Sequence, residues 1–191
     1  MIHGYVYVFR HGQTFDNKNG VFSGWRDSVL TPAGEKNART LAQKLKNKSI
    51  IFAFTSHLTR MRHTLREVLR FHPQAVVVED DRVIERCYGD LQGHTHAKFI
   101  ANYGKREYDK YHRGYGVVPP HGESIQMVEK RVFGFAQEVE KLVKERRCNV
   151  AVVCGNNSMR ALRRYFEKLT VAQMMKLENP YDQYFEYQIG G

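Results

Sequence analysis

The residues Tyr5-Val6-Tyr7-Val8-Phe9-Arg10-His11-Gly12 form an apolar run that ends in a cation, an imidazole and a glycine. An unbroken run of aromatic and β-branched residues predicts a strand over residues 5–9 that is buried on both faces. Similar runs occur at 51–54, 75–78 and 150–153. We expect these four runs to form the strands of one sheet.

Helical patterns lie between the apolar runs. Thr31 and Pro32 fit an N-cap and a first helical position, and the apolar residues that follow recur on one helix face: Ala38, Leu41, Ala42 and Leu45. Further helices are expected from Ser124 to about Arg147 and from Ser158 to Lys168. Strands alternating with helices predict a three-layer α/β/α fold with a mainly parallel central sheet.

The end of the chain is rich in aromatic residues. Tyr181, Tyr184, Phe185 and Tyr187 occur within seven positions. We interpret them as a packed strand at the edge of the sheet rather than as a platform for ligand recognition.

Length and composition limit the function classes. The chain has 191 residues, 42% of them hydrophobic, which suits a single domain over 1–191 with a buried core. No run approaches the ~20 apolar residues of a membrane span, and the N-terminus lacks the pattern of a secretory signal, so we expect a cytoplasmic protein without membrane partners. Thirty Lys and Arg against 20 Asp and Glu give a net charge of +10, which favours anionic partners.

His11 is the first candidate for chemistry. Ligands of open α/β sheets bind beyond the carboxyl ends of the strands, where Arg10-His11-Gly12 follows the first predicted strand. A single histidine is more often a packed or surface residue, but this one stands between a fixed cation and a glycine. Phosphoryl transfer to histidine needs a neutral ring nitrogen facing phosphorus and positive groups on the oxygens. Arg10 can supply one such group, and Gly12 leaves room for the backbone to approach a phosphate.

Two further residues complete this hypothesis. Arg60 follows another apolar run and opens a helix, so it is either a second phosphate ligand or a solvated helix residue. Glu85 lies in the loop 85–93, which contains two glycines and can present a carboxyl group to a pocket as a general acid. The alternative for Glu85 is an ordinary surface carboxylate.

Taken together, these stretches resemble the histidine phosphatase superfamily, and most closely its cofactor-dependent phosphoglycerate mutases. The resemblance covers nearly the whole chain. It is carried by the segments Phe9–Thr14, Phe22–Trp25, Leu30–Glu35, Thr55–Arg60, Glu85–Gly93 and Tyr115–Ser124.

The resemblance implies that His11 becomes phosphorylated, that Arg10 and Arg60 bind the transferring group, and that Glu85 donates and accepts the proton. It implies 2,3-bisphosphoglycerate as the phosphoryl primer of a mutase, and no metal. Asn17, Ser23 and Gly24 match the positions that line the family's phosphate site. Tyr88 and Arg113 match the positions that bind the far end of the substrate.

Two positions at that far end depart from the mutase pattern. His112 stands where the mutases usually have arginine, and His96 stands where they usually have lysine. Histidine leaves a hydrogen-bonding group at both positions, but it is a weaker cation at pH 7.

The largest departure is in Cys154-Gly155-Asn156-Asn157-Ser158. The resemblance assigns a second histidine to the position of Gly155, where it would donate to a phosphoryl oxygen, and loss of such a donor costs on the order of 10²–10³ in rate. Asn156, or the amides at the start of the following helix, could supply substitute donors, and Gly155, Asn156 and Asn157 are all candidate substrate-binding residues. Alternatively the chain is a slow or binding-only relative, or the residue was introduced deliberately.

Two other motifs give weaker indications of function. His94-Thr95-His96 lacks a third metal ligand at suitable spacing and fits an ordinary polar loop. The basic and aromatic run 105–113 resembles a nucleic-acid surface, but its acidic residues favour a lid over the substrate.

The function expected from the sequence is therefore interconversion of 2- and 3-phosphoglycerate in glycolysis and gluconeogenesis through phospho-His11. One alternative is a phosphatase of the same superfamily that acts on a small phosphate ester. Another is a catalytically impaired protein that binds a phosphometabolite or, less in keeping with the motifs, nucleic acid. Because relatives are often dimers, a homodimer is kept open.

Overall fold

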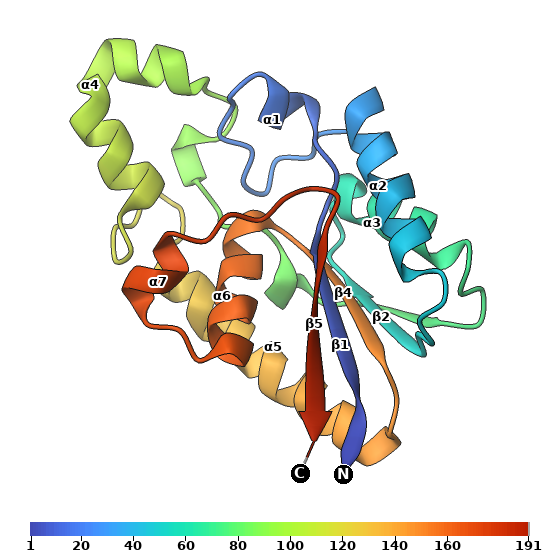
Figure 1. Ribbon diagram of the computed structural model, residues 1–191. Coiled ribbons are helices and arrows are strands. Elements are labelled where there is room, and N and C mark those ends of the chain that lie inside the picture. The colour runs from blue at the N-terminus through green and yellow to red at the C-terminus, as the bar shows by residue number, and fades with distance from the viewer. Residues whose placement is uncertain (191) are drawn as a thin grey trace.

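One five-stranded sheet forms the centre of the protein (Figure 1). The computed structural model describes residues 1–190. The strand order is β3-β2-β4-β1-β5. Strands β1, β4, β2 and β3 run parallel, and β5 is antiparallel to β1. Their bounds are β1 (Ile2–Arg10), β2 (Phe52–Thr55), β3 (Val76–Glu79), β4 (Val150–Cys154) and β5 (Tyr184–Gly190). The mainly parallel sheet predicted from the sequence is confirmed.

Helices cover both faces of the sheet, so the fold has three layers (Figure 1). The helices α2 (Pro32–Leu45) and α3 (Thr59–Leu69) pack on one face, with Tyr7 and Phe9 of β1. The helices α5 (Ile125–Arg146) and α6 (Asn156–Glu167) pack on the other, with Val6 and Val8. Because successive side chains of a strand point to opposite faces of the sheet, a run that is apolar at every position places apolar side chains in the core on each face.

Two expectations about the elements need correction. The run 75–78 was expected to be buried on both faces, but β3 is an edge strand, and Val76 and Val77 are each 51% exposed. Helix α6 begins at Asn156, two residues before the expected start at Ser158, so the first turn of the helix lies directly beside the loop that carries Glu85.

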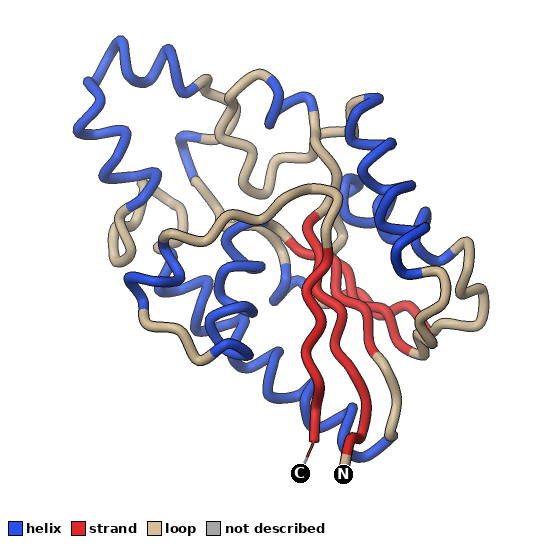
Figure 2. Tube along the Cα trace, viewed as in Figure 1, coloured by secondary structure: helices blue, strands red, loops and turns tan. Residues whose placement is uncertain are grey.

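Most of the remaining elements lie above the carboxyl ends of the parallel strands or close to them, and the last of them lies beside α6 (Figure 2). They are α1 (Phe15–Lys18), η1 (Asp81–Val83), η2 (Gly89–Leu91), α4 (His96–Arg113) and α7 (Val171–Met175). The segment His94–His96, expected to be a loop, leads into α4, because the side chain of Thr95 caps that helix by accepting from the amide of Lys98. The axis of α4 changes direction at Gly104. Across residues 1–190, every helix is too short or too polar to cross a lipid bilayer.

Candidate active site

A polar cavity of about 220 Å³ lies at the carboxyl edge of the sheet. It is lined by Arg10, Asn17, Gly20, Val21, Phe22, Ser23, Gly24, Glu85, Tyr88, His96, His112, Asn156, Asn157 and Tyr181. The structure thus brings together most of the site residues expected from the sequence. His11 and Arg60 are buried directly behind this lining, and Arg113 is not part of it.

The ring of His11 has one nitrogen fixed as a donor and the other as an acceptor. Nδ1 lies 2.8 Å from the carbonyl oxygen of Gly12, which can only accept, so the ring proton belongs on Nδ1. Nε2 then carries the lone pair, and it accepts from Nε of Arg60 at 3.3 Å. Burial and the charges of Arg60 and Arg10 hold the pKa of His11 well below its usual value. The ring is therefore neutral, as a nucleophile must be.

Gly12 packs closely against two helices. A side chain at this position would collide with the carbonyl group of Gly34 in α2, and the amide of Gly12 donates to Thr64 in α3 at 3.0 Å. The glycine is required by close packing against α2. It does not line the cavity, and the expectation that it leaves room for a phosphate stays a prediction.

Arg60 is a buried residue in the first turn of α3, and the structure excludes the solvated alternative. Its Nη2 group donates to the carbonyl of Gly24 at 2.7 Å and Nη1 to that of Arg26 at 2.9 Å. These bonds hold the guanidinium against Nε2 of His11. On the other side, Arg10 stacks on Tyr181, with its guanidinium carbon 4.1 Å from the ring centroid.

Several buried polar atoms around the cavity have no partner in the protein. They are Nε of Arg10, Oγ of Ser23 and Nδ1 of His112. Asn17 turns its side-chain oxygen to the amide of Thr14 at 3.1 Å, so its NH₂ group is the one left for a ligand. Because buried polar groups are normally hydrogen-bonded, these groups indicate a polar ligand, and the donors among them, from Arg10, Ser23 and Asn17, suit one that accepts hydrogen bonds.

Glu85 is buried and takes four hydrogen bonds on its carboxylate. The amides of Arg86, Asn156 and Asn157 donate at 2.7, 2.6 and 3.1 Å, and Nδ2 of Asn157 donates at 3.0 Å. Burial acts to raise the pKa of this carboxyl group, but the bonds from Arg86 and Asn157 and the charges of Arg10 and Arg60 outweigh it, and the net shift is downward. Glu85 is therefore ionised in the ligand-free protein.

Glu85 also occupies the space beside Gly155. Gly155 is the N-cap of α6 and has no side chain to cap the helix, so the Glu85 carboxylate binds the first helix amides instead. A Cβ atom at position 155 would lie 2.6 Å from Cα of Glu85. The helix amides proposed as substitute donors are thus already bound to Glu85, and a histidine would not fit at position 155 unless Glu85 moved.

The far wall of the cavity is lined by aromatic and imidazole rings. His96 packs against Phe22 with ring centroids 4.4 Å apart, and His112 stacks on Tyr108 at 4.9 Å. Burial lowers the pKa of His96, and burial followed by the charges of His96 and Arg113 lowers the pKa of His112 to about 4. Both rings are neutral at pH 7 and offer hydrogen bonds, but they do not supply the weak cations expected from the sequence.

The residues of the site that sequence reasoning missed include Tyr181, Asn179 and Arg131, besides Gly20, Val21 and Phe22 in the cavity lining. Tyr181 lies before β5 and lines the cavity, so its assignment to a packed edge strand is wrong, whereas Tyr184, Phe185 and Tyr187 do lie in β5. Asn179 contacts Arg10 and Asn156. Arg131 of α5 donates to the main-chain carbonyls of residues 82, 84 and 85 and so holds the Glu85 loop. Asparagine and arginine in polar stretches carry no local signal of such contacts.

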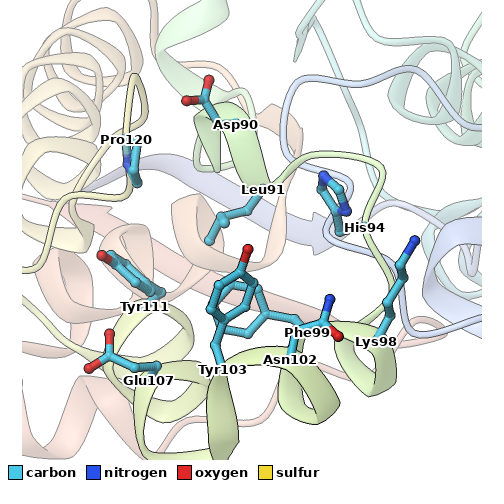
Figure 3. A pocket seen from close by; sticks show the side chains of 10 residues that line it. All are labelled: Asp90, Leu91, His94, Lys98, Phe99, Asn102, Tyr103, Glu107, Tyr111 and Pro120. Atoms are coloured by element: carbon cyan, nitrogen blue, oxygen red, sulfur yellow. The ribbon is translucent and has the colours of Figure 1, made fainter.

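A larger cavity of about 530 Å³ is lined in part by Leu91, Phe99 and Tyr111, which belong to the same apolar cluster as Phe22 and Tyr88 of the polar cavity. Leu91, Phe99 and Tyr103 point into it, and Lys98 and Glu107 lie at its rim (Figure 3). His94 lines this cavity, whereas His96 lines the polar one, so the two histidines of the 94–96 motif face different cavities. The larger cavity contains none of the expected catalytic residues.

Comparison with known proteins identifies the family of the chain. The family model of the histidine phosphatase superfamily (branch 1) matches residues 6–189. The 2,3-bisphosphoglycerate-dependent phosphoglycerate mutase of Cytophaga hutchinsonii is 38% identical over 165 residues, which cover 85% of this chain and 77% of the relative. That of Parvibaculum lavamentivorans is 34% identical over 176 residues, covering 89% and 83%.

Solved structures give the same fold. The alpha-ribazole phosphatase of Shigella flexneri superposes with a TM-score of 0.85 at 22% identity, over 95% of this chain and 89% of the other, which bears on the fold alone. A mycobacterial glucosyl-3-phosphoglycerate phosphatase superposes with a TM-score of 0.79 at 26% identity, over 91% and 84%. The family-model match over residues 6–189 and the relatives at 34–38% identity show that the chain belongs to the histidine phosphatase superfamily.

Proposed function

We propose that the protein transfers phosphoryl groups of small phosphate esters through a phosphohistidine at Nε2 of His11. The observation that carries this proposal is the fixed tautomer of the ring: Gly12 holds the proton on Nδ1, and the lone pair of Nε2 faces Arg60. Donors for a phosphate surround the same cavity.

In the first step Nε2 attacks phosphorus, and the bond from phosphorus to the ester oxygen breaks. Arg60 must release Nε2 as the new bond forms, and its freed Nε–H can then bind a phosphoryl oxygen, as can Arg10. The departing oxygen needs a proton. Because a phosphate dianion beside Glu85 raises the pKa of the carboxyl group, Glu85 can carry that proton once the substrate is bound.

In the second step an oxygen nucleophile attacks the phosphohistidine, and the bond from phosphorus to Nε2 breaks. Glu85, left ionised after the first step, accepts the proton of the attacking hydroxyl group. The hydrogen bonds from Asn156 and Asn157 orient its carboxylate for this exchange.

We propose phosphoglycerate mutase as the specific activity, with 2,3-bisphosphoglycerate as the phosphoryl donor that primes His11. The names of the relatives at 34–38% identity support this proposal. The net charge of +10 favours encounter with a multiply anionic substrate.

A phosphatase is the second candidate, and one observation favours it. The far wall carries the neutral rings of His96 and His112, which form no ion pair with a substrate carboxylate. Water would then replace the phosphoglycerate hydroxyl as the nucleophile of the second step.

Product analysis separates the two. We expect 3-phosphoglycerate with catalytic 2,3-bisphosphoglycerate to yield 2-phosphoglycerate, with His11→Gln abolishing the reaction. Release of inorganic phosphate without isomerisation identifies the phosphatase. Retention of either activity by His11→Gln would contradict both candidates.

A further inference from the structure

The loop between α7 and β5 passes over the start of α6 and carries the buried residue Asn179 (Figure 1). The main-chain oxygen of Asn179 accepts from Nη1 of Arg10 at 3.4 Å. Its side-chain Nδ2 lies 3.0 Å from Oδ1 of Asn156 and 3.2 Å from the carbonyl oxygen of Asn156. One residue thus joins two residues that line the polar cavity.

The orientation of the Asn179 amide follows from its partners. Nη1 of Arg163 lies 3.2 Å from Oδ1 of Asn179, and a guanidinium group only donates, so the oxygen must face Arg163. The main-chain carbonyl of Asn156 only accepts, so Nδ2 of Asn179 must face it. The chain of donors therefore runs from Arg163 to Asn179 to Asn156, and the last member has to accept through Oδ1.

This arrangement leaves one side-chain group of Asn156 for a ligand. The main-chain N–H of Asn156 donates to Glu85, and the side-chain Oδ1 of Asn156 accepts from Asn179. Its Nδ2 group remains, and the residue lines the cavity. An NH₂ group donates to phosphoryl oxygens, whereas the neighbouring Gly155 has no side chain to do so.

We infer that Asn179 is a positioning residue: by holding Oδ1 of Asn156 it turns Nδ2 of Asn156 toward the phosphoryl group during transfer. The inference rests on the proposed function. A donor fixed in advance is most effective where negative charge develops, so Asn156 would act mainly on the five-coordinate phosphorus and supply the bond that Gly155 lacks.

The most direct test is Asn179→Asp, which keeps the size of the side chain but removes its NH₂ group. A carboxylate at position 179 only accepts, so the Asn156 amide would turn its NH₂ group toward it and present its oxygen to the phosphoryl group. The probe is orthovanadate, which adopts the five-coordinate geometry, with inorganic phosphate as the ground-state comparison and calorimetric titration as the measurement.

We expect Asn179→Asp to weaken orthovanadate binding 10- to 100-fold and phosphate binding less than threefold. Gln183→Glu adds the same charge at an exposed position of the same loop and should leave both affinities within twofold. Asn179→Ala keeps the main-chain bond to Arg10 and is expected to weaken orthovanadate binding three- to tenfold. This variant replaces Asn179→Asp in the test if Asn179→Asp does not fold.

A double-mutant cycle separates positioning from general stability. In an Asn156→Ala background, where the positioned amide is gone, Asn179→Asp should change orthovanadate affinity by less than twofold. An equal loss in both backgrounds, or no loss in the unaltered background, would overturn the inference while the proposed function stands. Failure of the unaltered chain to bind orthovanadate would contradict the proposed function and the inference together.

Discussion

At the scale of single residues, the site depends on which of its groups are charged. His11 is neutral because it is buried between cations, and Glu85 is ionised because its hydrogen bonds and nearby cations outweigh its burial. A nucleophile and a base are therefore both ready before a ligand arrives, and only the first proton donation has to wait for the phosphate.

Glu85→Gln tests the role of the carboxylate. Glutamine keeps the shape, but its NH₂ group replaces one of the two oxygens that accept from the amides of Asn156 and Asn157, so one of these bonds is lost, and the side chain cannot exchange a proton. We expect turnover to fall about 10²–10⁴-fold and the free energy of unfolding to fall by about 1–3 kcal/mol. Steady-state kinetics and denaturant unfolding measure the two effects, and unchanged turnover would exclude Glu85 from proton transfer.

His112 predicts a specific pH dependence of stability. Its pKa is about 4 in the folded chain and near 6.5 when unfolded, so between these values the unfolded chain binds more protons. The free energy of unfolding should therefore fall as the pH drops from 6.5 to 4, with a contribution from His112 on the order of 1–3 kcal/mol. His112→Asn should flatten this slope in pH-resolved urea unfolding. An identical slope in both proteins would show that the ring is not held neutral.

At the scale of elements, the Glu85 loop and the start of α6 form one unit. Arg131 fixes the loop through three carbonyls, and Glu85 caps the helix that Gly155 leaves uncapped. The glycine is needed for close contact, so its presence and the placement of Glu85 have the same physical cause.

Gly155→Ala should disturb both parts of this unit. A Cβ atom 2.6 Å from Cα of Glu85 forces the loop to move, so we expect a loss of about 1–3 kcal/mol in stability and at least a tenfold loss in turnover. Gly134→Ala in α5 is the matched control, because a Cβ there meets nothing within 4 Å, and it should be neutral or stabilise by up to about 1 kcal/mol. Equal behaviour of the two variants in thermal unfolding and kinetics would contradict the account.

The local patterns predicted most of these elements. Apolar runs identified β1, β2 and β4, and the Thr31-Pro32 cap identified the start of α2, because such signals depend on neighbouring residues. The exposure of β3 was not predictable, because strand order decides which run lies at an edge. The start of α6 was placed late because its cap comes from Glu85, far away in the sequence.

At the scale of the whole molecule, the cavity is assembled from segments at both ends of the chain. His11 and Arg60 follow strands at the carboxyl edge, which the sequence could indicate. Asn179 and Tyr181 reach Arg10 from a loop about 170 residues away, and no spacing rule predicts such a contact. The low pKa values of His96 and His112 were equally unpredictable, because they follow from burial of the two rings in the folded chain.

The attachment site of phosphorus tests the central claim most directly. The protein is loaded from 2,3-bisphosphoglycerate with ¹⁵N-labelled histidine, and phosphorus–nitrogen couplings in NMR spectra identify the bonded nitrogen. Because Gly12 holds the proton on Nδ1, the account predicts a single phosphohistidine bonded through Nε2 of His11, absent in His11→Gln. Phosphorus on Nδ1 of His11, on another residue or on none would contradict it.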